Sequence, residues 1–77
     1  MNTYDEKISE IELNIRLRPV YAYVDAFELF KHYRDGMELS GPTANGVRRL
    51  RQCADLMGRA LDAQIRKFEE NLQEEQR

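Results

Sequence analysis

The stretch from Val20 to Phe30, VYAYVDAFELF, is the most apolar part of this sequence and limits what the chain can fold into. Asp25 and Glu28 are its only charged residues, so any core must close over it. At about 100° per residue, its apolar side chains cover more than half of the circumference of a helix. A helix that lies on a single neighbour needs an apolar stripe only a little over about 100° wide. The pattern therefore predicts a central helix packed against at least two neighbours.

Signals at both ends set the bounds of this central helix. Pro19 suits the first helical position, where its missing N–H costs nothing, and Gly36 suits the position after the last turn. We therefore expect the helix to cover about 19–35. The segment 36–46, GMELSGPTANG, contains three glycines and a proline, which predict a connection in which the chain turns back.

A long amphipathic helix is predicted over about 43–72, capped by either Ser40 or Thr43. Its apolar residues recur at steps of three and four and form a first stripe of Val47, Leu50, Ala54, Met57, Leu61, Ile65, Phe68 and Leu72. A shorter second stripe lies beside it and consists of Cys53, Leu56, Ala60 and Ala63. Because small residues let a neighbouring backbone come close at a helix crossing, we expect the second stripe to form a dimer interface.

The N-terminal segment, about 4–18, matches two templates. As a helix it has Thr3 and Glu6 at capping-box spacing, and a single stripe of Tyr4, Ile8, Ile11 and Ile15. As a strand it alternates, with one side formed by Ile11, Leu13, Ile15 and Leu17. We favour the helix, which makes the fold class all-α: a helical hairpin of the central and long helices, with a short N-terminal helix.

A chain of 77 residues makes one small domain, which buries only around 60% of the surface that its unfolded form exposes. Domains of this size usually need a disulfide, a metal or oligomerisation as well. Cys53 is the single cysteine and His32 the single histidine, so an intrachain disulfide and a zinc-type ligand spacing are both excluded. Together with the surplus apolar surface of both long helices, this predicts that the chain is not a monomer, and a two-fold homodimer is the commonest solution.

The net charge of −2 argues against a general nucleic-acid binder, but the charge is unevenly distributed. Residues 39–68 carry six basic and two acidic side chains and lie between two acidic ends. The longest unbroken apolar run, Val20–Val24, is far shorter than the roughly 20 residues of a membrane span, and the first residues, MNTYDEK, do not resemble a signal sequence. We expect a cytoplasmic protein with no membrane partner.

Candidate chemical groups are few. His32 follows Glu28 by four residues and Asp25 by seven, which is typical of the solvated face of an amphipathic helix. With no recognisable nucleophile, base and oxyanion donors, the sequence predicts no enzyme, and we expect no catalytic residue, cofactor or metal. Arg48 and Arg49 lack carboxylates four residues away and lie where cations oppose the helix dipole. We therefore predict that they bind an acidic group of a partner.

These features predict a small helical interaction protein that regulates, adapts or inhibits another protein, like many phage and bacterial accessory factors. The alternative depends on the strand. The order of a strand, Pro19 and two helices resembles that of ribbon-helix-helix repressors, whose paired strands enter the major groove of DNA. That resemblance implies a dimeric transcriptional regulator in which Asn14, Arg16 and Arg18 contact the bases.

Overall fold

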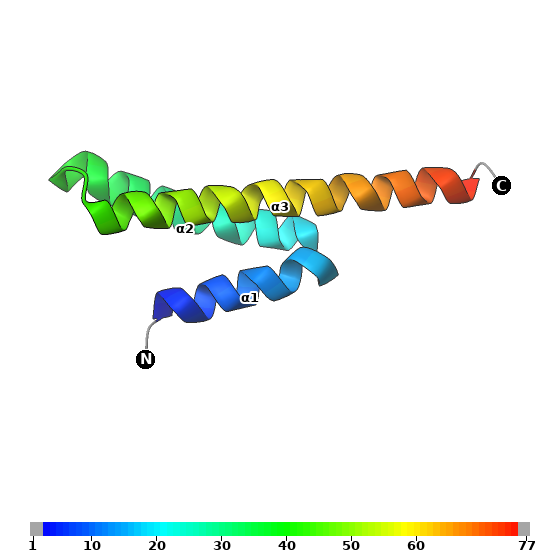
Figure 1. Cartoon of the computed structure of the whole chain (residues 1–77), viewed down its shortest axis with the longest axis horizontal. Coiled ribbons are helices and arrows are strands. Elements are labelled where there is room, and N and C mark those ends of the chain that lie inside the picture. The colour runs from blue at the N-terminus through cyan, green and yellow to red at the C-terminus, as the bar shows by residue number, and fades with distance from the viewer. Residues whose placement is uncertain (1–2, 76–77) are drawn as a thin grey trace.

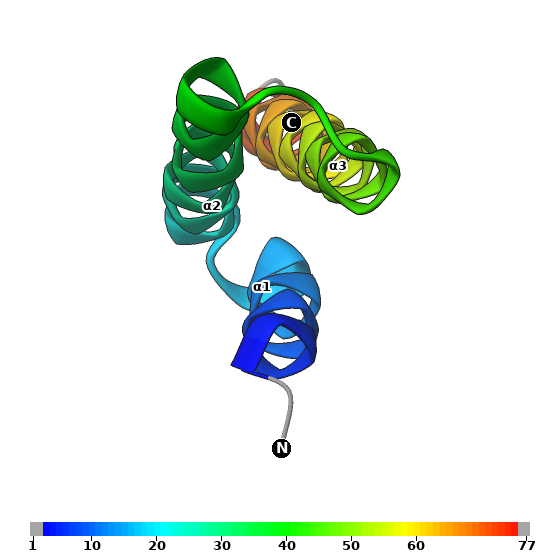
Figure 2. The ribbon, with the colours of Figure 1, turned by 90° about the vertical axis from the view of Figure 1, so that its left-hand side faces the viewer.

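Three helices make up the computed structural model, which describes residues 3–75. Helix α1 covers Thr3–Leu17, α2 covers Pro19–Ser40 and α3 covers Ala44–Glu75. The all-α class is confirmed, and α2 and α3 pack against each other as a helical hairpin. Figure 1 shows α1 below this hairpin, and the end view in Figure 2 shows the three helices at the corners of a triangle.

The molecule is elongated, with extents of 55 × 26 × 15 Å. Most of the length comes from α3, whose C-terminal part, orange to red in Figure 1, extends beyond the ends of α1 and α2. The contact between Lys67 and the carbonyl oxygen of Leu17, at 3.5 Å, marks the level at which α1 ends. None of the helices described over residues 3–75 has the length and apolar character required to cross a membrane.

Helix α1 is helical throughout, so the strand interpretation of its second half is wrong. The three isoleucines, Ile8, Ile11 and Ile15, are all buried, and a helix is what turns residues at this spacing to one side. Leu13 and Leu17, which a strand would have placed beside them, are 61% and 62% exposed. Burial of the isoleucine stripe therefore decides between the two templates.

Helix α2 is longer than predicted, because it continues through Gly36 and ends at Ser40. The glycine that ends it is Gly41, which has a φ of 92°, a left-handed conformation that glycine adopts without strain. Its N–H donates to the carbonyl oxygen of Met37 at 2.8 Å and satisfies one of the last helical acceptors. Gly36 has no positive φ and is an ordinary helical residue, so the predicted end at residue 35 is wrong.

The other helix ends agree more closely with the sequence. Pro19 lies in the first turn of α2, as predicted. Thr43, rather than Ser40, caps α3: its hydroxyl accepts a hydrogen bond from the N–H of Gly46 at 3.0 Å. Helix α3 then continues three residues beyond the predicted end, to Glu75.

The core lies between all three helices, and α2 contacts both α1 and α3 as its wide apolar arc predicted. Helix α1 contributes branched side chains, whereas α2 and α3 contribute mostly small ones, which allow the two helices of the hairpin to pack closely. The buried hydrophobic residues of this core are Ile8, Ile11, Ile15, Ala22, Ala26, Leu29, Cys53, Leu56 and Ala60.

Candidate interaction surface

The second stripe of α3, predicted to be a dimer interface, lies inside the chain. Cys53, Leu56 and Ala60 are at most 2% exposed, and Ala63 is half-buried at the edge of the same core. Small residues do permit a close crossing here, but the neighbours are α1 and α2 of the same molecule. The predicted position of the interface is therefore wrong, because this stripe is already covered without a second copy.

The first stripe of α3 is the one that remains exposed. With the exposed apolar residues of α2 it forms a surface that we call the apolar face. Its large side chains are between 39% and 61% exposed and comprise Val20, Val24, Phe27, Val47, Leu61, Ile65, Phe68 and Leu72. Half-buried Tyr23, Phe30, Leu50 and Met57 lie between the α2 row and the α3 row.

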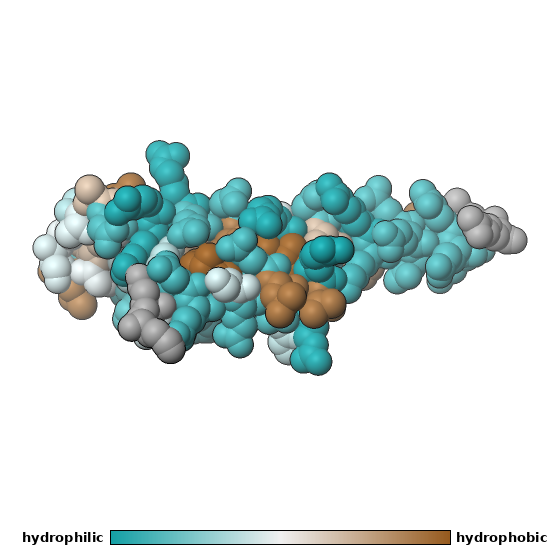
Figure 3. Space-filling view, turned by 60° about the horizontal axis from the view of Figure 1, so that its bottom comes forward, coloured by the Kyte–Doolittle hydropathy of each residue, from teal (hydrophilic) through white to brown (hydrophobic). Residues whose placement is uncertain are grey.

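The apolar face lies on the side of the hairpin opposite α1. Residues of α3 that contact α1, such as Gln52 and Lys67, are separated from the stripe by more than about 100° around the helix. On α2, Asp25 and Leu29 line the groove towards α1. They are likewise separated from the α2 residues of the apolar face by more than about 100° around the helix on average. Figure 3 views the molecule from the α1 side, and from there the projecting end of α3 is mostly hydrophilic.

A cluster of aromatic and cationic side chains joins the three helices near the loop between α2 and α3. We call Tyr4, Tyr33 and Arg49 the tyrosine–arginine cluster. The Arg49 Nη1 donates to the Tyr33 hydroxyl at 3.0 Å, and its guanidinium lies 4.4 Å from the Tyr4 ring centroid and 5.1 Å from that of Tyr33. The two rings meet edge to face at 5.6 Å. Each helix contributes one member, so the cluster ties α1 to the hairpin.

The position of Tyr4 gives its phenol an unusual environment. Its hydroxyl donates to the Oε1 of Gln52 on α3 at 2.6 Å. Burial raises the pKa of Tyr4 above its usual value; the nearby Cys53 raises it further, whereas Arg49 lowers it. Burial likewise raises the pKa of the Cys53 thiol. Both groups are therefore held in their neutral forms by the fold.

The two arginines predicted to bind a partner have different surroundings. Arg49 is half-buried and engaged within the cluster, so its assignment as a partner-binding residue is not supported by its position. Arg48 is exposed, and its Nη2 donates to the Asn45 Oδ1 at 2.5 Å. Its role at a partner surface stays a prediction. The one sequence signal for this cluster was the position of Tyr4 on the isoleucine stripe of α1, which indicates that its ring points inward. The structure places Arg49 beside that ring.

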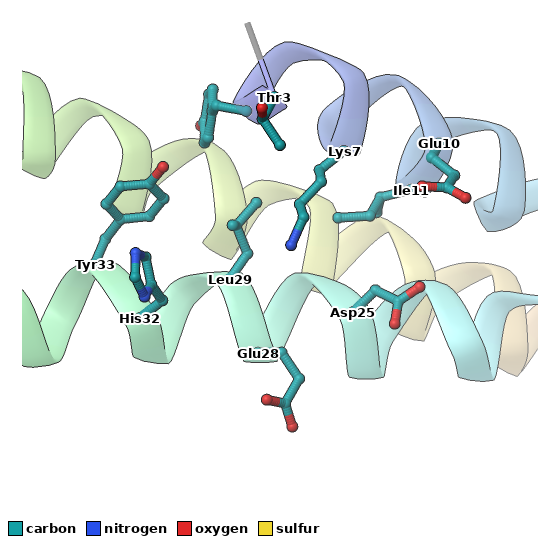
Figure 4. Close-up of a pocket in the computed structure, with 10 residues that line it drawn as sticks. Thr3, Lys7, Glu10, Ile11, Asp25, Glu28, Leu29, His32 and Tyr33 are labelled. Carbon is teal, nitrogen blue, oxygen red and sulfur yellow. The ribbon is translucent and has the colours of Figure 1, made fainter.

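The groove between α1 and α2, with a volume of about 520 Å³, contains the acid and histidine residues noted in the sequence. In the close-up of Figure 4, Glu28 points away from α1, whereas Lys7 extends from α1 towards α2. His32 is exposed and meets the ring of Tyr33 edge to face at 5.1 Å. Within residues 3–75, no three His, Cys, Asp or Glu side chains are grouped so as to hold a metal ion.

The residues expected to contact DNA in the alternative interpretation are not brought together. Asn14 and Arg16 lie on a helix, where residues two apart point about 200° away from each other. Arg18 is the single residue between α1 and α2, and its guanidinium lies 5.9 Å from the ring of Tyr21. The segment that carries all three therefore has no shared reading surface.

Comparisons of the chain with protein-family models, with curated proteins and with solved structures gave no match. The chemical character of its own surfaces then carries the functional argument. The tyrosine–arginine cluster is directed into the bundle, and the groove between α1 and α2 is lined by residues of mixed charge. The apolar face is the exposed feature whose burial would release the most free energy.

Proposed function

We propose that this chain is a small, non-enzymatic helical module that binds another protein as a regulator, adaptor or inhibitor, and that it works as a homodimer. The apolar face is the observation that carries this proposal. Its eight large side chains are on average about half exposed and lie on one side of two packed helices. Contiguous apolar patches of more than a few hundred Å² usually mark an interaction site.

The size of the face is sufficient to drive association. If a partner covered about 600 Å² of apolar surface, the gross gain would be on the order of 15 kcal/mol. Association itself costs about 4–15 kcal/mol in lost translational and rotational freedom. The gain therefore matches or exceeds the cost, whereas the exposed charges on α1 offer no comparable driving force.

The surroundings of the chemically reactive side chains favour a non-enzymatic role. The thiol of Cys53 is fully buried, and burial raises its pKa, so it is protonated at neutral pH and suits a core residue rather than a nucleophile. His32 and Glu28 are exposed at the groove between α1 and α2, as expected for a solvated helix surface.

Affinity capture with a matched pair of variants tests the proposal. Leu61→Asp places a charge in the apolar face, whereas Leu13→Asp makes the same change on α1; the two leucines are 50% and 61% exposed, so neither change disturbs the core. We expect the wild type and Leu13→Asp to capture the same proteins and Leu61→Asp to lose them, with equal helical circular dichroism in all three. Retention by Leu61→Asp, or no specific capture by the wild type, would contradict the proposal.

The exposed Arg48 adds a second, electrostatic test. Its reversal in Arg48→Glu leaves the core intact, and we expect several-fold weaker capture that depends on salt, because an exposed arginine that meets an acidic group of a partner acts mainly through electrostatics. Arg16→Glu, which changes an exposed arginine on α1, is the matched control. Equal capture by both variants would make Arg48 an ordinary surface residue.

A further inference from the structure

We infer that a second copy of this chain covers the apolar face, in an antiparallel arrangement that places the C-terminal part of each α3 over the loop end of the other copy's hairpin. This inference rests on the proposed function, since it names the surface through which the proposed homodimer forms. Three observations carry it: an uncovered stripe on the projecting helix, opposite charges at the two ends of the face, and a glycine at its centre.

The projecting part of α3 continues the apolar face where its own chain provides no neighbour. Ile65, Phe68 and Leu72 are 55%, 61% and 56% exposed. Since α1 ends at the level of Lys67 and α2 begins directly after α1, the helix beyond this level extends past both of them (Figure 1). An amphipathic helix with a free apolar stripe is stabilised by a neighbour that runs alongside it. The neighbour must come from another molecule.

The basic end of the face lies at the loop of the hairpin. The ammonium group of Lys31 lies 5.6 Å from the ring of Phe27, which places it on the α2 edge of the apolar face. Arg34 follows on the same side of α2 but pairs with Asp35 at 3.3 Å. Arg51 lies beside the stripe at the start of α3. Within the chain from 3 to 75, Arg51 forms no ion pair, although the next charged side chain along that edge, Asp55, pairs with Arg59 at 3.8 Å.

The acidic end of the face lies at the projecting tail. Residues 69–75 carry four glutamates and no basic residue. Glu69 lies on the same edge of α3 as Arg51, and over the described part of the chain it too has no ion pair, whereas Asp62 pairs with Arg66 at 3.0 Å. A parallel second copy would bring like charges together, which is destabilising. An antiparallel copy brings each tail to the basic loop end of the other.

The two unpaired charges define where the two-fold axis passes. Arg51 and Glu69 are 18 positions apart in the sequence, or about 27 Å along α3 at 1.5 Å per residue. An axis near the midpoint, close to Leu61, therefore sets Arg51 of one copy beside Glu69 of the other at both ends.

Gly58 lies near this axis and has no structural role within one chain. It is exposed, and a Cβ built on it would meet nothing within 4 Å. Glycine inside a helix costs about 1 kcal/mol relative to alanine. At a two-fold axis the missing side chain allows a second α3 to approach closely, with the large Leu61 of one copy over Gly58 of the other.

The area is also sufficient for a stable pair. Each copy offers several hundred Å² of apolar surface, and adjoining polar side chains bring this close to the about 800 Å² per partner of a standard interface. Because each copy uses the same surface, the contact closes on itself and the assembly stops at two chains.

Light scattering combined with size exclusion at micromolar concentration tests which surface pairs. We expect a mass of two chains for the wild type and for Leu13→Asp. Leu61→Asp should give a mass of one chain, with a dimer dissociation constant raised by about 100-fold or more, because its charge is buried without a partner. A wild type with the mass of one chain, or a dimer that Leu61→Asp leaves intact, would overturn the inference.

A charge exchange tests the antiparallel orientation. Arg51→Glu and Glu69→Arg should each raise the dimer dissociation constant by roughly tenfold, since each change affects two symmetric pairs. The double variant should recover most of the wild-type affinity. Affinity of the double variant no better than that of the single variants would overturn the antiparallel pairing.

The two proposals fail in different ways. A mass of one chain for the wild type, with captured proteins that are lost in Leu61→Asp, would reject the second copy and the homodimer, but would leave the proposed binding of another protein intact. A two-chain mass that Leu61→Asp abolishes, with no protein captured by the wild type, would support the second copy and reject the proposed function.

Discussion

Replacing Arg49 by methionine should destabilise the fold more than replacing any exposed arginine. Methionine keeps the apolar stem of the side chain and removes the guanidinium. The change therefore deletes the hydrogen bond to the Tyr33 hydroxyl and the stacking on Tyr4 and Tyr33, while the packing of the helix stays in place. Since Tyr4 is the member from α1, the loss also weakens the attachment of α1 to the hairpin.

The magnitude follows from these contacts. A hydrogen bond from a charged donor contributes about 1.5–3 kcal/mol, and each cation–π contact of a partly exposed guanidinium contributes about 0.5–1 kcal/mol. All three interactions share one group and are not additive, so we expect Arg49→Met to lower the free energy of unfolding by about 2–3 kcal/mol. In a domain of this size, that lowers the Tm by roughly 10–20 °C.

Urea unfolding followed by circular dichroism measures this change. The concentration of chains must be the same for every variant, because any association of the folded form adds to the apparent stability. Arg48→Met is the matched control and should change the free energy of unfolding by less than about 0.5 kcal/mol, since Arg48 is exposed. Tyr33→Phe removes only the hydroxyl and should cost about 1.5 kcal/mol, the lower end of the range for a charged donor.

A double-mutant cycle of Arg49→Met and Tyr33→Phe shows whether the hydrogen bond accounts for the shared part of the loss. We expect the second change to cost almost nothing once the first has been made. Equal stabilities of Arg49→Met and Arg48→Met would refute this account of the tyrosine–arginine cluster.

Two further predictions concern pH and glycine. Because burial raises the pKa of Cys53 and Tyr4, the folded chain holds these protons more tightly than the unfolded chain. The stabilisation from these two groups is complete below their usual pKa values, about 8.5 for Cys53 and 10 for Tyr4. The free energy of unfolding should therefore fall as the pH rises above these values, and Tyr4→Phe should reduce the fall at the highest pH. A constant free energy of unfolding from pH 7 to 11 would contradict this. Gly46→Ala should destabilise by about 1 kcal/mol, because its Cβ would lie 2.6 Å from the Sδ of Met37 and 2.9 Å from the capping oxygen of Thr43. Gly36→Ala, where a Cβ meets nothing within 4 Å, should stabilise by about 0.5–1 kcal/mol, and thermal unfolding that ranks the two alike would refute this reading.

The central and long helices could be predicted from the sequence because their apolar periodicity is strong. The N-terminal segment matches both a helix and a strand, and only the burial of its isoleucines in the structure decides for the helix. The end of α2 could not be read in the same way. Gly36 and Gly41 can each end a helix, and the local sequence does not rank them. The difference is tertiary: Met37 is half-buried and lies against the start of α3 near Gly46, so packing extends the helix past the first glycine.

The local sequence likewise does not tell which of the two stripes of α3 is buried within the chain. Both are apolar, and the small residues of the second stripe fit a close crossing with a second copy as well as one within the chain. The small side chains of α2 settle the matter, because Ala22 and Ala26 leave room for Cys53 and Ala60 and bring the hairpin together through the narrower stripe. The contacts of Arg49 were not predictable for a related reason, since its partners lie on two other helices and share no local pattern with it.

The burial of Cys53 gives this protein a built-in reporter of its own opening. Its thiol is fully buried, and Tyr4 of α1 lies close enough to be influenced by its charge. Helix α1 is joined covalently to α2 through the single residue Arg18, and its non-covalent contacts with the hairpin can open in a local event that costs less than global unfolding. Each time α1 detaches, the thiol becomes exposed to solvent, so the rate at which a small alkylating reagent modifies Cys53 measures how often α1 detaches. This local opening is thereby recorded at a single atom, without any introduced label.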